Sequence, residues 1–194
     1  YAALGIPDEC TLAGVVRAHA EAKKAGLPLI IGAHFHVHNP DGSPALSLIV
    51  LAQNRQGYGN LSELITLART RSAKGTYLLN PADLAAPRPE FAHLKGLPDC
   101  LTILLPSYPG HDPAGVDRLH KQLAWMNAAF PGRVWLGLNL LHRAFDDAHR
   151  ITVEEVARQH GVRTVAVGHV CMHLRSRKPM QDTLCPTRLG RPVA

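Results

Sequence analysis

The sequence contains few cysteines and few aromatic residues. Its four cysteines are scattered, and none forms a Cys-x-x-Cys pair; they are Cys10, Cys100, Cys171 and Cys185. This spacing argues against a disulfide framework and against a zinc-finger module, and we expect reduced cysteines in a cytoplasmic protein. Because aromatic residues make up only 5% of the chain, the hydrophobic core must consist mainly of Leu, Val, Ile and Ala.

Long apolar runs and several well-known catalytic motifs are also missing. No run approaches the roughly 20 apolar residues of a membrane helix, so we expect no membrane partner. The sequence has no Gly-x-Ser-x-Gly nucleophile elbow, and Gly57-Tyr-Gly-Asn lacks the glycine pattern and lysine of a phosphate-binding loop. What remains is a 194-residue chain with 46% hydrophobic residues and a net charge of +6, which suits one globular domain beside a nucleic acid.

The pattern of apolar residues predicts alternating strands and helices. A hairpin is expected from residues 34–38 and 46–52, joined by an Asn-Pro-Asp-Gly-Ser turn. The other predicted strands are 2–6, 29–31, 100–105, 134–141 and 164–167, and the predicted helices are 11–25, 60–72, 114–129 and 153–160, with short helical segments near 81–84 and 179–183. Most of these strands are continuously apolar, which indicates an α/β fold whose sheet or barrel is covered on both faces.

Residues that can bind a metal recur after the predicted strands. They are Asp8 and Glu9; His34, His36 and His38; Tyr108 and His111; His142 and Asp146; and His169, Cys171 and His173. Alternate residues of an extended segment share a face, so two such stripes could hold a metal cluster, and metal-activated water attacking a phosphoester would be the natural chemistry. The alternative is that His36 and His38 are simply solvated at a hairpin and that no metal binds.

Three blocks of the sequence resemble the PHP (polymerase and histidinol phosphatase) domain of bacterial C-family DNA polymerases. They are residues 1–26, YAALGIPDECTLAGVVRAHAEAKKAG; residues 51–70, LAQNRQGYGNLSELITLART; and residues 165–194, VAVGHVCMHLRSRKPMQDTLCPTRLGRPVA. The Met-His-x-Arg-Ser-Arg-Lys-x-x-Gln-Asp segment in the last block is closer to the error-prone branch than to the replicative alpha subunit of DNA polymerase III.

This resemblance implies a (β/α)7-like barrel with a metal site at its mouth. In the family, a strand bearing His-x-His comes just before the position of Tyr1, so we expect a barrel that lacks its first strand. Residues 1–174 would be the truncated PHP domain, and residues 175–194 a basic junction leading to the polymerase core. The polymerase palm would lie beyond Ala194.

The resemblance also implies that the metal site is degenerate. Asp8 matches the family, but Glu9 stands where histidine is usual, His34 where glutamate is usual, and Asn139 replaces another glutamate. Residues 169 and 171 occupy the place of an Asp-x-His pair. The candidate metal ligands are Asp8, Glu9, His34, His36, His169, Cys171 and His173, which could hold zinc or manganese or no metal at all.

Two main functions follow as hypotheses. In the first, the chain is a structural PHP domain whose parent protein synthesises DNA in damage tolerance and repair, with the polymerase core, DNA and other damage-tolerance proteins as partners. Arg175, Arg177 and Lys178 would then lie near template phosphates or form a solvated turn. In the second, it is an active metal-dependent phosphoesterase, acting as a 3′–5′ exonuclease or a separate phosphatase. A third possibility is a fragment or a pseudogene product.

Overall fold

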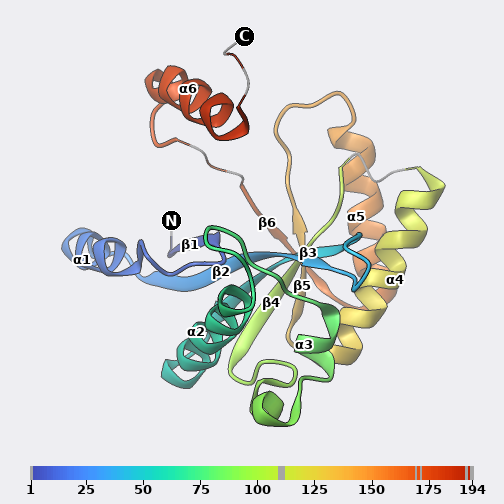
Figure 1. The fold of residues 1–194 in the computed structure, drawn as a ribbon. Coiled ribbons are helices and arrows are strands. Elements are labelled where there is room, and N and C mark those ends of the chain that lie inside the picture. The colour runs from blue at the N-terminus through green and yellow to red at the C-terminus, as the bar shows by residue number, and fades with distance from the viewer. Residues whose placement is uncertain (1, 109–111, 169, 171, 191, 193–194) are drawn as a thin grey trace.

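Six strands form one curled sheet in the order of the chain, β1-β2-β3-β4-β5-β6 (Figure 1). The computed structural model describes residues 2–108, 112–168, 170, 172–190 and 192. The strands are β1 (Leu4–Glu9), β2 (Leu29–His38), β3 (Pro44–Ala52), β4 (Cys100–Leu105), β5 (Val134–Leu138) and β6 (Arg163–Ala166). Antiparallel pairing joins β2, β3 and β4, whereas β1 with β2 and the β4-β5-β6 set are parallel.

Helices lie around the outside of this curled sheet (Figure 1). They are α1 (Val15–Ala25), α2 (Arg55–Thr70), α3 (Pro81–Ala85), α4 (Pro113–Ala129), α5 (Asp146–His160) and α6 (Lys178–Leu189), with short 3₁₀ turns η1 (Pro89–Leu94) and η2 (Arg175–Arg177). The expected α/β architecture is therefore confirmed. The hairpin of β2 and β3 was also predicted correctly.

The hydrophobic core lies between the sheet and the helices. From β2, Ala33, Phe35 and Val37 are buried, and Leu48 and Val50 are buried beside them on β3. The residues between them in the sequence face the other side of the sheet, because successive side chains of a strand alternate. The polar residues His34 and His36 therefore lie on the face opposite the core.

The prediction for β1 was wrong in its limits. We expected the strand to end at Ile6, but it continues through Pro7 to Glu9, and Asp8 and Glu9 pair with Ala33 and His34 of β2. Proline is tolerated there because β1 is an edge strand of the described sheet. We also expected two separate segments, 29–31 and 34–38, but β2 runs unbroken from Leu29 to His38. Glycine fits at position 32 within it, because a Cβ would lie 2.7 Å from the carbonyl oxygen of Val50.

Helix ends depend on local hydrogen bonds that differ from our expectations. The Thr11 hydroxyl accepts a hydrogen bond from the backbone N–H of Ala13 (3.1 Å), so it closes a turn and α1 starts later, at Val15. The predicted stop at Gly26 is confirmed, since this residue is left-handed with φ of 64°. Helix α2 begins at Arg55, earlier than predicted, because the Asn54 side chain caps it by accepting from the Gly57 N–H.

The C-terminal helix α6 stands apart from the sheet and packs mainly against η2 (Figure 1). The expected boundary near residue 174 and the junction role of the segment after it remain predictions. Within the described part of the chain, no helix is both long and apolar enough to span a membrane.

Candidate functional site

Two histidines of β2 are linked through a serine of β3. Ser47 is the register partner of His36, so both side chains lie on the same face of the sheet. The Ser47 Oγ is 2.7 Å from His34 Nε2 and 3.3 Å from His36 Nδ1, and the two imidazole centroids are 4.5 Å apart. We call this group the His-Ser-His chain.

The His-Ser-His chain can run in two directions, because the Ser47 hydroxyl carries a single proton. If Ser47 donates to His36 Nδ1, His36 carries its proton on Nε2 and presents an N–H donor. If Ser47 donates to His34 Nε2, His36 Nδ1 donates to Ser47 and His36 Nε2 keeps its lone pair. The first arrangement suits an oxyanion ligand, and the second suits a metal ion.

Glu9 is held by a tyrosine. The Tyr77 hydroxyl donates to Glu9 Oε1 at 3.2 Å and accepts from the backbone N–H of His36 at 2.9 Å. Burial, followed by smaller contributions that include the Glu9 carboxylate, raises the pKa of Tyr77 to about 12. Tyr77 therefore stays protonated at neutral pH and continues to donate to Glu9.

Asp8 and Glu9 are directed to opposite faces of β1. Asp8 pairs in register with the buried-face residue Ala33, and its Oδ2 is 3.2 Å from where a Cβ would stand on Gly14, just before α1. Glu9 is in register with His34 on the polar face. Their adjacency in the sequence thus does not place both carboxylates in one site.

The remaining predicted ligands do not complete a site among the described residues. His169 and Cys171 lie outside those residues, and His173 is exposed on the segment that follows β6. Across the described ranges, no three His, Cys, Asp or Glu side chains are placed to hold a metal ion. The predicted metal site therefore stays a prediction, and the described donors alone do not fit one, since catalytic zinc sites take three protein ligands.

The loop after β5 supplies further polar groups, and its acidic residue Asp146 is already paired within the loop. Asp146 forms an ion pair with Arg143 (3.2 Å), and the Arg143 guanidinium lies 3.3 Å from the centre of the Tyr108 ring. Asn139 on the same loop has a buried Oδ1 without a hydrogen-bond partner among the described residues. The side chain of Asp146 thus orders this loop and is engaged by arginine.

A polar groove of about 710 Å³ runs from the strand ends toward α4. Its polar lining comes from the His-Ser-His chain, His38, Ser107, and Arg118 and Gln122 of α4, and the rest of its walls is apolar, with Val37, Leu46 and Leu105 among them. Sequence reasoning missed Arg118 because it lies inside a helix among other charged residues, with no motif around it. Only its place on the α4 face that meets the β2–β3 hairpin shows its relation to the groove.

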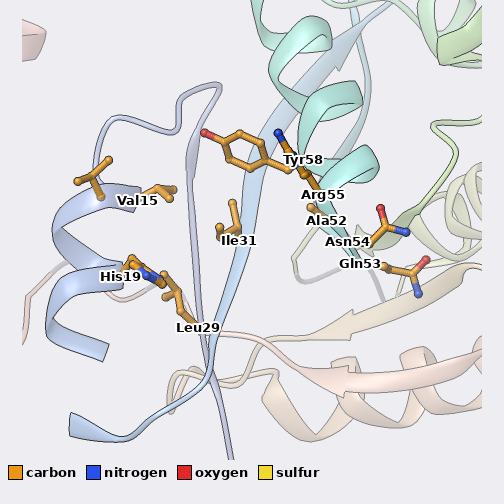
Figure 2. A pocket seen from close by; sticks show the side chains of 10 residues that line it. Val15, His19, Leu29, Ile31, Ala52, Gln53, Asn54, Arg55 and Tyr58 are labelled. Atoms are coloured by element: carbon orange, nitrogen blue, oxygen red, sulfur yellow. The ribbon is translucent and has the colours of Figure 1, made fainter. Parts of the chain in front are cut away.

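A second hollow, between α1 and α2, is mostly apolar (Figure 2). It measures about 490 Å³, and its walls include Val15, Leu29, Ile31 and Tyr58, with His19 and Arg55 as its basic residues. This composition offers no set of acid, base and nucleophile. The polar groove is accordingly the candidate functional site.

Comparison with known proteins agrees with the fold. The family model described as the PHP domain matches residues 1–130. The chain therefore belongs to the PHP domain family.

Within this family, the sequence is similar to error-prone DNA polymerases. It is 55% identical over 193 residues to the error-prone DNA polymerase of Bordetella parapertussis, covering 100% of this chain and 18% of that protein. The error-prone DNA polymerase of Burkholderia mallei is 50% identical over 201 residues, again covering 100% of this chain and 18% of the relative. The chain thus spans less than a fifth of the length of these relatives.

One solved structure shows the same fold. It is a candidate metal-dependent phosphoesterase from Bifidobacterium adolescentis, with a TM-score of 0.53 and 12% sequence identity, covering 85% of this chain and 76% of that one. At this identity the likeness concerns the fold alone.

Proposed function

We propose that this chain is the PHP domain of a cytoplasmic DNA polymerase of the error-prone kind and that it has a structural role with a degenerate metal site. The parent protein would carry out DNA synthesis in damage tolerance and repair, with the polymerase core of the same protein as the domain's main partner. The support is sequence identity of 50–55% along the entire chain to proteins of that name, of which it spans 18%.

The observation that carries the structural role is the pairing of polar side chains at the strand ends. His34 and His36 are bonded through Ser47, and Glu9 is bonded to Tyr77. Asp8 is directed to the other face. These groups brace neighbouring strands with one another, and the described residues do not converge as three metal ligands. We therefore derive no hydrolytic step for this site.

The basic segment after residue 174 is proposed to lie near DNA. Arg175 and Arg177 are exposed in η2, so their guanidinium groups are accessible to phosphates. Lys178 forms an ion pair with Asp182 at 2.5 Å on its own helix, which reduces its share in such a contact. The two arginines are therefore the stronger candidates.

Metal analysis and nuclease assays of the full-length protein test this proposal. We expect no stoichiometric zinc or manganese and no 3′–5′ exonuclease activity, and we expect a His36→Ala variant to behave like the control His19→Ala, whose imidazole is exposed on α1. Stoichiometric metal together with nuclease activity, both lost in a His169→Ala variant, would instead establish the active phosphoesterase.

A further inference from the structure

The apolar hollow between α1 and α2 lies where the core face of the sheet is left uncovered (Figure 2). Its floor includes Leu29 and Ile31 of β2, which are only half-buried. They alternate onto the same face as Ala33 and Phe35, which are fully buried further along the strand. Because a hairpin joins β2 directly to β3, this connection supplies no helix to pack over the start of β2. The hydrophobic core therefore opens to solvent at this point.

The two helices beside the hollow are incompletely packed as well. Helix α1 has no buried residue, and the side chain of Val16 on the wall of the hollow is 81% exposed. On the opposite wall, Tyr58 of α2 is 39% exposed. A surface helix of a folded domain normally buries its apolar face against a neighbour. Among the described residues, no such neighbour covers these two walls.

The rim of the hollow is basic. Arg55 lines it at the start of α2, and Lys23 is four residues beyond the lining residue His19, which places it on the side of α1 that faces the hollow. The described walls carry no aspartate or glutamate. The acid of α1, Glu21, pairs instead with Lys24 at 2.7 Å. An occupant with acidic side chains beside its apolar ones therefore suits this surface.

We propose that an amphipathic helix from the remainder of the parent polypeptide packs into the hollow between α1 and α2. Its apolar residues, three and four positions apart, cover Val16, Ile31 and Tyr58. Glutamate or aspartate residues on its flanks pair with Lys23 and Arg55. The inference rests on the proposed function, in which this chain is one domain of a longer protein.

The size of the hollow favours an occupant that is tethered to the domain. Ten residues line the hollow, whereas a stable interface between separate proteins takes about 20–30 residues on each side. A segment of the same polypeptide is held at a high effective concentration, so a small contact is enough to keep it in place. The relatives contain many such segments, since this chain spans 18% of their length.

Helix α6 does not have the charges of this occupant. It exposes Met180 and Leu184, which are four positions apart on one side of the helix. However, the acid in its described part, Asp182, already pairs with Lys178 at 2.5 Å. It has no free carboxylate to offer to the basic rim, so the occupant is assigned to a segment outside these 194 residues.

Photo-cross-linking of the full-length protein tests the inference, with p-benzoylphenylalanine in place of Val16. This position accepts a large side chain, because the valine is largely exposed. We expect links to a segment outside residues 1–194 that has apolar residues at helical spacing and acidic flanks, identified by mass spectrometry of the linked peptides. In a mixture of protein with light and heavy isotopes, these links should stay within one chain.

Hydrogen exchange of the full-length protein gives a measurement without the bulky label. Val16→Asp places a charge against the occupant, so the amides of α1 should exchange faster than in the wild type. Aspartate in the first turn itself favours the helix, so faster exchange reports the loss of the occupant. The matched control is Ile151→Asp on α5, which replaces another exposed apolar residue and should leave the exchange of α1 unchanged.

Charge reversal tests the basic rim. Lys23→Glu should lower the yield of the cross-link from position 16 by about threefold or more, because attraction to an acidic flank becomes repulsion. The matched control is Lys24→Glu, which changes the net charge equally on the next residue of α1, about 100° further around the helix. Its yield should equal that of the unreversed protein.

The absence of links beyond residues 1–194, together with unchanged exchange of α1 in Val16→Asp, would overturn the inference. Links to a second copy or to another protein would overturn it too, as would equal yields in Lys23→Glu and Lys24→Glu. Stoichiometric metal with nuclease activity would instead defeat the structural role and leave the cross-links as expected here, so the two failures are distinguishable.

Discussion

His120 of α4 and His160 at the end of α5 share a hydrogen bond. His120 Nδ1 is 2.9 Å from His160 Nε2, and the ring centroids are 5.2 Å apart. One nitrogen must donate and the other accept, so at most one of the two rings can be fully protonated while the bond persists. Burial and, to a smaller extent, the charge of His120 lower the pKa of His160 from its ordinary 6.5.

This pair predicts a loss of stability in weak acid. Since the folded-state pKa of His160 is lowered, the unfolded chain binds more protons, and the free energy of unfolding falls as the pH drops below about 6.5 toward the folded pKa. His160→Gln should therefore show a smaller difference in that free energy between pH 7.5 and pH 5.5 than the wild type. Urea unfolding at both pH values measures it, with His19→Gln as the control. If the difference in the free energy of unfolding between the two pH values is the same in His160→Gln as in the wild type, the lowered pKa of His160 is not its cause.

At the scale of elements, two glycines of α2 predict opposite effects. A Cβ on Gly57 would lie 2.0 Å from the carbonyl oxygen of Asp99, whereas a Cβ on Gly59 would meet nothing within 4 Å. Gly57→Ala should lower the free energy of unfolding by about 2 kcal/mol or more, because backbone must shift. Gly59→Ala should raise it by about 0.5–1 kcal/mol, because alanine favours a helix. Urea denaturation measures the free energy of unfolding of both variants. A Gly59→Ala variant less stable than the wild type would show that the space around this position is not open.

Strands and helices whose limits depend only on local sequence were predictable. Strand β4 was predicted with both limits correct, as a continuous apolar run between Asp99 and Pro106. The start of α2 was missed because Gly57 and Gly59 lower helix propensity, and the Asn54 cap outweighs them. Such local signals need no knowledge of tertiary contacts. When a helix cap and a low helix propensity point to different start residues, however, a single sequence does not show which of the two effects is stronger.

The candidate site was less predictable, because it depends on which strands and helices become neighbours. The shared face of His34 and His36 follows from alternation within β2 and was predicted. Ser47 joins them only through the register between β2 and β3, and Arg118 comes from a helix distant in sequence. The resemblance of the sequence to its family predicted a degenerate site. It did not predict the hydrogen bonds through Ser47 and Tyr77 that hold the side chains of this site.

At the scale of the whole molecule, α6 is expected to add little to the stability of the domain. It packs mainly against η2, so removing residues 175–194 should shift the melting temperature by less than about 2 °C. Calorimetry of the shortened chain measures this shift. The control removes residues 163–194, which also deletes β6 and its pairing with β5, and should lower the melting temperature markedly. A comparable loss in both chains would place α6 within the domain.

The strand order has a consequence for how the protein is made. Each strand of the sheet pairs with the strand that precedes it in the chain, from β1 through β6. As the ribosome releases the polypeptide, every new strand therefore meets a partner that has already emerged, and no pairing waits for a distant segment. Synthesis from the N-terminus can extend the sheet stepwise, and the growing edge is covered by each strand that follows.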